Sequence, residues 1–147
     1  MHHDGFTVLG KRFFSLGGQT HNSSSYFPED MARSFDSVRQ LGGNTVATPV
    51  CWDAFEPEEG EFREDYVRAI VDQARAADLH LVLLWFGTWK NGTMEYTPNW
   101  VKRDPSRFPR TLCPNGERTA VLSCHSESSD PSVGILVRTA RRISPRR

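Results

Sequence analysis

Three short segments of the chain place aromatic rings beside amide, hydroxyl and charged side chains. They read QTHNSSSY at 19–26, WDAFEP at 52–57 and WFGTWKN at 85–91. A sugar has an apolar face that stacks on rings and hydroxyl groups that need hydrogen-bond partners. Because a buried polar partner left unpaired is costly, such residues also confer specificity. These residue types therefore favour binding of a small carbohydrate.

The candidate substrate-binding residues follow the ends of three apolar runs and are His21, Asn22, Trp52, Asp53, Trp89, Lys90 and Asn91. Each has a structural alternative. A lone histidine is usually structural, and Asp53 suits a turn as well as a ligand contact. Trp85 lies within an apolar run and is expected in the core. Trp89 lies beyond that run in a loop, where functional residues concentrate, so sugar stacking is favoured over packing.

The remaining carboxylates and the cysteines have simpler interpretations. Glu56 precedes Pro57 in a turn, where structural hydrogen bonding is favoured over catalysis. The acidic run at 58–64 leads into a helix and is typical of a solvated face placed well for the helix dipole. The three cysteines, an odd number without a CxxC pair, favour unpaired thiols over a disulfide or a zinc site. No metal and no cofactor are expected.

Alternating strands and helices would position these segments. Apolar runs at 12–18, 44–52 and 79–86 predict strands, and helical spacing between them predicts helices near 28–41 and 66–77. The run at 79–86 is typical of a parallel strand covered on both faces. Pro49 predicts a bulge or a strand end, because it cannot donate to a ladder. Parallel strands end at one edge of a sheet, so the three segments are expected to meet there.

Two α/β architectures accommodate this pattern. One is a small doubly wound sheet, but the segment after the first strand reads GGQTHNSSSYF and has no phosphate-binding glycine motif. The other is part of an eight-stranded barrel, which needs about 250 residues when complete and so implies truncation. Composition and periodicity leave both open.

A longer pattern adds a resemblance. Trp52-x-x-x-Glu56-Pro57-x-x-Gly60-x-Phe62 resembles the second-strand signature of β-galactosidases in glycoside hydrolase families 35 and 42. The segments LVLLWFGTWKNG at 81–92 and YTPNWVKRDPSRFPR at 96–110 are similar to a bacterial branch related to both. The resemblance covers 5–116. It implies an α/β fold, the N-terminal part (about three βα units) of a (β/α)8 TIM barrel, incomplete as written.

The resemblance also implies a retaining mechanism with two glutamates about 5–5.5 Å apart. One would lie in an Asn-Glu pair after the fourth strand and the other after the seventh strand. Both are absent here, so no catalytic residue is assigned. The first hypothesis is a glycoside hydrolase acting on terminal β-galactosides, truncated and inactive alone. Its rival is a small non-catalytic carbohydrate-binding or interaction domain.

The composition changes along the chain. All Phe, Trp and Tyr residues lie at or before Phe108. We therefore expect 1–118 to be the barrel part and 119–147 to be a divergent Ser/Arg/Pro-rich tail, disordered or read from a shifted frame rather than a natural short isoform. Only 133–137 is expected to form a strand there, since Pro131 and Gly134 interrupt a helix.

The balance of 18 Lys+Arg against 18 Asp+Glu does not suggest a nucleic acid or membrane-surface partner. The sequence has no apolar run of about 18 residues and no apolar stretch at its start, which predicts a cytoplasmic protein. The oligomeric state stays open.

Overall fold

The computed structural model describes residues 6–123, 126 and 130–143. Its centre is a parallel sheet in the order β3-β4-β5. The strands are β3 (Gly17–Gln19), β4 (Thr45–Cys51) and β5 (His80–Phe86), and the longer helices are α1 (Pro28–Gln40), α3 (Glu64–Ala76) and α5 (Asp130–Ile143). The short elements are β1 (Thr7–Val8), β2 (Lys11–Arg12), η1 (Ser24–Tyr26), α2 (Trp52–Phe55), α4 (Asn99–Arg103), β6 (Arg110–Leu112) and β7 (Arg118–Leu122). The predicted strand–helix–strand–helix–strand order is confirmed.

The main core lies between the sheet and its helices. Pro28 stands in the first turn of α1, where its missing N–H costs nothing, and Met31 and Phe35 form the buried face of this helix. Every fourth or third position of α3 is buried in the same way, and these side chains pack on Val46 and Val50 of β4. The periodicity that predicted these helices therefore marks their core faces.

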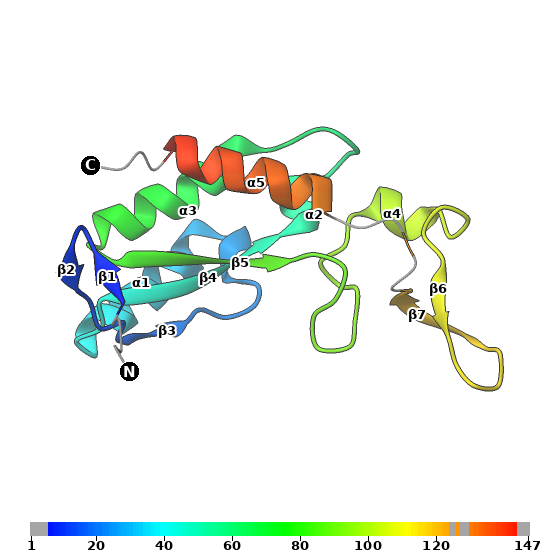
Figure 1. Cartoon of the computed structure of the whole chain (residues 1–147), viewed down its shortest axis with the longest axis horizontal. Helices are drawn as coiled ribbons and strands as arrows, with labels where there is room; N and C mark the ends of the chain where they lie inside the picture. The colour runs from blue at the N-terminus through cyan, green and yellow to red at the C-terminus, as the bar shows by residue number, and fades with distance from the viewer. Residues whose placement is uncertain (1–5, 124–125, 127–129, 144–147) are drawn as a thin grey trace.

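Only part of the second face of β5 is covered, contrary to the prediction for 79–86, since Phe86 is buried at its carboxyl end. Leu81, Leu83 and Trp85 pack towards the helices, but His80 and Val82 are exposed, Val82 to 47%. The helices α1, α3 and α5 contribute to one core on one side of the sheet, and α5 runs alongside α3 (Figure 1). The apolar run at 79–86 therefore predicts the strand correctly but does not predict how much of each face is covered.

The first strand begins later than the predicted 12–18. Arg12 belongs to the β1–β2 hairpin, and the Phe13 ring packs edge-on against His80 with ring centroids 4.4 Å apart. The strand that joins the sheet includes the glycines expected to end it. A Cβ at Gly17 would lie 1.6 Å from the carbonyl oxygen of Thr45, so only glycine allows this close approach to β4.

The predicted interruption of β4 at Pro49 is also wrong. β4 continues to Cys51 in unbroken register with β5. Along a strand, the backbone N–H and C=O groups of residues two apart point to the same neighbouring strand. The nitrogen of Pro49 therefore points to β3, as that of Ala47 does. The last bond between the two strands runs from the Thr20 N–H to the Ala47 carbonyl oxygen (2.9 Å), and beyond it β3 separates from β4. Proline therefore ends the β3 ladder and leaves the β5 ladder intact.

The tail contains a helix rather than the strand predicted at 133–137. α5 spans Asp130–Ile143, and Pro131 falls in its first turn, where proline is tolerated. Its buried side chains are Ser132, Leu136, Thr139 and Ile143, at helical spacing. Because Ser132 and Thr139 are polar, the apolar periodicity of this helix is weak in the sequence. The expectation of a disordered tail thus fails for 130–143, while the boundary at 118 and the shifted frame stay predictions.

Two contacts fix α5 to α3. Arg142 forms an ion pair with Glu64, and the Arg75 guanidinium donates to the carbonyl oxygen of Ile143 at 2.6 Å.

None of the helices within the described residues is both long and apolar enough to cross a membrane.

Candidate functional site

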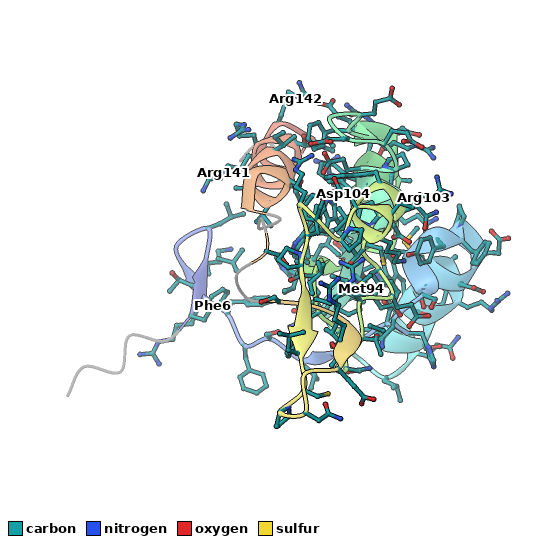
Figure 2. The ribbon with its side chains drawn as sticks, turned by 90° about the vertical axis from the view of Figure 1, so that its right-hand side faces the viewer. Phe6, Met94, Arg103, Asp104, Arg141 and Arg142 are labelled. Carbon is teal, nitrogen blue, oxygen red and sulfur yellow. The ribbon has the colours of Figure 1, made fainter. Side chains whose placement is uncertain are left out.

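The segments that follow β3, β4 and β5 meet at the carboxyl end of the sheet. The Tyr26 hydroxyl of η1 donates to Asp53 Oδ1 at 2.6 Å, and the Asp53 N–H donates to the carbonyl oxygen of Tyr96 at 3.0 Å. The Tyr26 and Tyr96 rings are stacked with centroids 6.4 Å apart, and Phe86 lies 5.2 Å from Tyr96. We call Tyr26, Cys51, Asp53, Phe86 and Tyr96 the carboxyl-end cluster. Figure 2 views the molecule from this end.

A second layer of hydrogen bonds supports the cluster from α3. The Tyr66 hydroxyl donates to Ser25 Oγ at 2.8 Å and accepts from the Cys51 N–H at 3.2 Å. The Cys51 thiol lies 3.7 Å from the same Ser25 oxygen. Burial raises the pKa of both Cys51 and Tyr66, so both stay protonated at neutral pH. Cys51 and Cys113 are unpaired as predicted, and Cys124 lies outside the described residues.

Opposing effects act on Asp53. Burial raises the pKa of its carboxyl group, while the Tyr26 hydrogen bond and the Lys102 charge lower it. Burial and the bond to Asp53 raise the pKa of Tyr26, so this phenol remains a hydrogen-bond donor. The carboxylate is therefore held at a partly desolvated position by a donor that does not ionise in the neutral range.

Among the predicted site residues, Asp53 belongs to the carboxyl-end cluster, whereas Trp52 is buried in the neighbouring core. Trp52 is 1% exposed, and its indole N–H donates to Glu56 Oε2 at 2.7 Å, so its ring is part of the core. Asn22 is half-buried and its carbonyl oxygen lies 3.9 Å from Cys51 Sγ. His21 is exposed and lines a hollow of about 280 Å³ beside Asp30 and Ser34 of α1. A ligand role for these residues stays a prediction.

The three candidates after β5 have distinct environments. Lys90 places its ammonium 4.3 Å from the Phe86 ring centroid, over the cluster. Asn91 and Gly92 have φ values of 54° and 77° in a turn closed by reciprocal Lys90–Thr93 backbone bonds, the geometry of a type I′ turn. The Asn-Gly pair signals this turn in the sequence. Trp89 is 57% exposed, and its indole N–H donates to the Leu122 oxygen at 3.1 Å.

Glu56 has the structural role that its position before a proline predicted. Its Oε2 accepts from the Trp52 indole at 2.7 Å and from Ser132 Oγ at 2.5 Å, and its Oε1 accepts from the Gly60 N–H at 2.9 Å. The side chain is 4% exposed. Because Gly60 has a φ of 82°, glycine suits this turn. Glu56 therefore joins α2, the following loop and α5.

Comparison with known proteins relates this chain to β-galactosidases. No family model matches the chain. It is 33% identical to Beta-galactosidase-1-like protein 3 of Homo sapiens over 115 residues, which is 72% of this chain and 17% of that protein. It is 29% identical to Beta-galactosidase 11 of Arabidopsis thaliana over 118 residues, 74% of this chain and 14% of that protein. The chain is similar to one segment of β-galactosidases.

A solved structure supports the fold. Exo-beta-1,4-mannosidase Op5Man5 from Opitutaceae bacterium strain TAV5 matches with a TM-score of 0.53 and 24% identity, over 66% of this chain and 20% of that one. The α/β fold is therefore that of a partial barrel, with the parallel order β3-β4-β5, and the alternative of a doubly wound sheet is set aside.

Of the five members of the carboxyl-end cluster, sequence reasoning identified only Asp53; Cys51 and Phe86 lie in apolar runs that predicted strands. Tyr26 lies in the candidate segment at 19–26, but nothing in the sequence indicates its bond to Asp53. Tyr96 lies in an irregular loop, ten residues after Phe86, where no periodicity predicts its direction. The described residues contain no group of three His, Cys, Asp or Glu side chains that could hold a metal ion.

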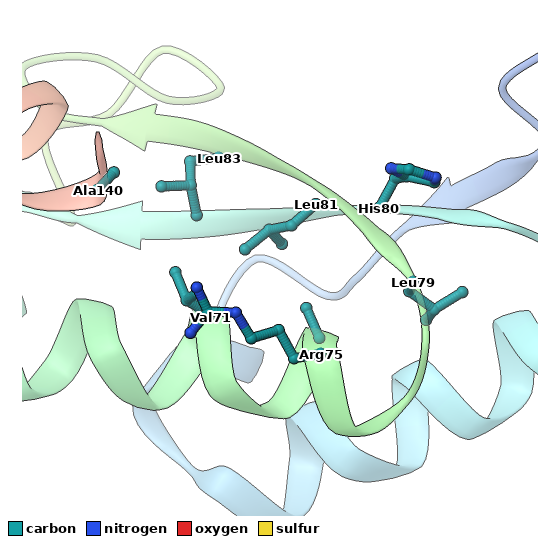
Figure 3. A pocket seen from close by; sticks show the side chains of 8 residues that line it. Val71, Arg75, Leu79, His80, Leu81, Leu83 and Ala140 are labelled. Atoms are coloured by element: carbon teal, nitrogen blue, oxygen red, sulfur yellow. The ribbon is translucent and has the colours of Figure 1, made fainter. Parts of the chain in front are cut away.

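A separate hollow lies at the other end of β5. It has a volume of about 340 Å³ and is lined by α3, β5 and α5 through residues such as Arg75, His80, Leu83 and Ala140 (Figure 3). Apolar residues line it together with Arg75 and His80. It does not include any member of the carboxyl-end cluster, so we place the candidate site at the cluster.

Proposed function

We propose that this chain is the opening part of a retaining glycoside hydrolase acting on terminal β-galactosides. Its role would be to supply one side of the sugar pocket within a closed (β/α)8 barrel. The observation that carries the proposal is the convergence of three strand ends on the Tyr26–Asp53 pair. Sugar sites of barrel enzymes are built at this end of the strands. The β-galactosidase relatives supply the substrate class.

The proposal assigns no catalysis to this chain by itself. A retaining mechanism needs two carboxyl groups about 5–5.5 Å apart, one to protonate the leaving oxygen and one to attack the anomeric carbon. Glu56 is occupied by three structural donors, and Asp53 is the carboxylate within the cluster. The catalytic pair is therefore expected after later strands of the barrel.

The test measures binding and hydrolysis separately. Methyl β-D-galactopyranoside is titrated into the ¹⁵N-labelled chain, and hydrolysis of p-nitrophenyl β-D-galactoside is followed in parallel. The proposal expects millimolar binding that shifts the amides of Asp53, Tyr96 and their neighbours, without hydrolysis. Hydrolysis by the purified chain would refute the assignment of catalysis to other residues, and absence of binding would refute a sugar pocket at this edge.

A second candidate is a small non-catalytic carbohydrate-binding domain. The contact between Ser132 and Glu56 favours it, because α5 gives the chain a third helix docked on its own core. This candidate expects a soluble monomer with a sharp cooperative melt and sugar binding without hydrolysis. Sequencing the gene across codon 119 and beyond separates the two, since only the enzyme proposal requires a downstream Asn-Glu pair and a later glutamate.

A further inference from the structure

We propose that Asp53, positioned by the Tyr26 hydroxyl, selects the sugar by accepting hydrogen bonds from two neighbouring hydroxyl groups. This inference rests on the proposed function and deepens it, because it names the group that recognises the ligand and the chemistry it uses. It concerns ligand recognition and leaves the bond-breaking residues to other parts of the barrel.

The position of Asp53 fixes where its carboxylate points. It lies in the first turn of α2, directly after the central strand β4, and its N–H is bound to the Tyr96 oxygen at 3.0 Å. Tyr26 reaches the same carboxylate from the segment after β3. Asp53 is thus bonded to the segments after both neighbouring strands, and its side chain remains half-exposed.

The comparison with Glu56, three residues later, indicates a ligand role for Asp53. Glu56 is 4% exposed and receives three donors, from Trp52, Gly60 and Ser132. Asp53 accepts one hydrogen bond from another segment, the Tyr26 hydroxyl at 2.6 Å, while the amides of Asp53 and Ala54 act on it from within its own turn and lower its pKa. A carboxylate has about four acceptor sites. Glu56 is therefore nearly saturated by groups from three segments and is buried, whereas Asp53 is partly exposed and keeps acceptor capacity.

Tyr26 is a positioning residue rather than a ligand contact. Its ring stacks on Tyr96 at an interplanar angle of 23°, and Tyr96 packs on Phe86, which lies beneath the Lys90 ammonium. This stack holds the phenol in one orientation. Its bond to Oδ1 fixes the plane of the Asp53 carboxylate, so that the remaining acceptor directions are set before a ligand arrives.

The charges around Asp53 favour a neutral ligand rich in donors. The ionisable groups that act on it are Tyr26 of η1, the Cys51 thiol of β4 and Lys102 of α4. The Lys102 ammonium donates to the backbone carbonyl oxygen of Glu95 at 2.8 Å. Hydroxyl groups donating to a carboxylate form charge-assisted bonds, which are stronger than neutral ones. Two hydroxyls of one sugar satisfy these acceptors without adding charge.

The experiment titrates methyl β-D-galactopyranoside into the full chain and three variants, followed by ¹⁵N NMR. Asp53→Asn should weaken binding about tenfold, because one charge-assisted acceptor becomes a donor. Asp36→Asn, the same change on the exposed surface of α1, should leave affinity unchanged. Tyr26→Phe should weaken binding about threefold at pH 7 and shift the pH midpoint of binding upward, because Tyr26 lowers the pKa of Asp53.

The wild-type chain gives a second measurement that needs no variant. Affinity should fall as pH decreases, with the same midpoint as the ¹³C titration of the Asp53 carboxyl group. Binding by wild type with equal affinities for Asp53→Asn and Asp36→Asn, or with a different midpoint, overturns the inference and leaves the proposed function standing. No binding by wild type overturns both. An unshifted midpoint in Tyr26→Phe overturns the positioning role.

Discussion

Removal of the Glu56 carboxylate should destabilise the fold strongly. Glu56→Ala leaves the Trp52 indole, the Gly60 N–H and the Ser132 hydroxyl without their acceptor in a region that is 4% exposed. An unsatisfied buried polar group costs about 1–3 kcal/mol. Because water enters the cavity and recovers part of this loss, we expect a total of about 3–5 kcal/mol, a large share of a typical folding free energy.

Two further variants make this prediction specific. Glu56→Gln keeps one acceptor oxygen but replaces the other with an NH₂ group, which faces N–H or O–H donors. We therefore expect a smaller loss of folding free energy, about 1–3 kcal/mol. Glu58→Ala changes an exposed glutamate two residues away and should stay within about 0.5 kcal/mol of wild type. Urea unfolding followed by tryptophan fluorescence measures all three free energies.

Hydrogen exchange identifies the contact that is lost. Because Ser132 joins α5 to Glu56, amides of 130–143 and Gly60 should exchange faster in Glu56→Ala, while those of β4 should change less. If Glu56→Ala matches Glu58→Ala in stability and in the exchange of α5, the reasoning that Glu56 is a structural junction is refuted.

Three further predictions concern the site. Burial raises the folded-state pKa of Asp53, so its contribution to stability falls as pH rises between its unfolded and folded pKa values. Asp53→Asn should therefore flatten the pH dependence of the free energy of unfolding, measured by urea unfolding at several pH values. Gly92→Ala should cost about 1 kcal/mol in thermal unfolding because φ is 77°, whereas Asn91→Gly should be neutral in stability and weaken sugar binding only if Asn91 contacts ligand. A thiol reagent at pH 8 should label exposed Cys113 well before buried Cys51, and the reverse order by mass spectrometry would contradict the burial of Cys51.

Periodicity predicted those elements whose buried positions are apolar. The helices near 28–41 and 66–77 correspond to α1 and α3, because Met31, Phe35, Ile70 and their neighbours repeat at helical spacing. α5 was missed because Ser132 and Thr139 occupy two of its buried positions, where a hydropathy pattern registers polar residues. β3 was misplaced because its defining property is close approach to β4, which glycine permits and hydropathy does not record.

The site was predicted as a region but not as a set of contacts. Parallel strands bring their carboxyl ends together whatever the side chains are, so the three segments were expected to meet, and Asp53 was expected among them. Pairing of Asp53 with Tyr26 depends on the turn at η1, and the place of Tyr96 depends on the path of an irregular loop. Neither has a repeating pattern in the sequence.

Two carboxylates three residues apart show why residue type alone does not assign function. Both follow β4 within WDAFEP, and both are capable of accepting hydrogen bonds from hydroxyl groups. The difference is the number of donors that the protein already supplies: three reach Glu56, including Ser132 from a helix 76 residues further along the chain. A carboxylate whose acceptors are filled by its own fold gains little from a sugar hydroxyl, since binding would require breaking existing bonds. Asp53 accepts one side-chain hydrogen bond, from Tyr26, and is partly exposed, so a sugar hydroxyl adds a bond there without displacing Tyr26.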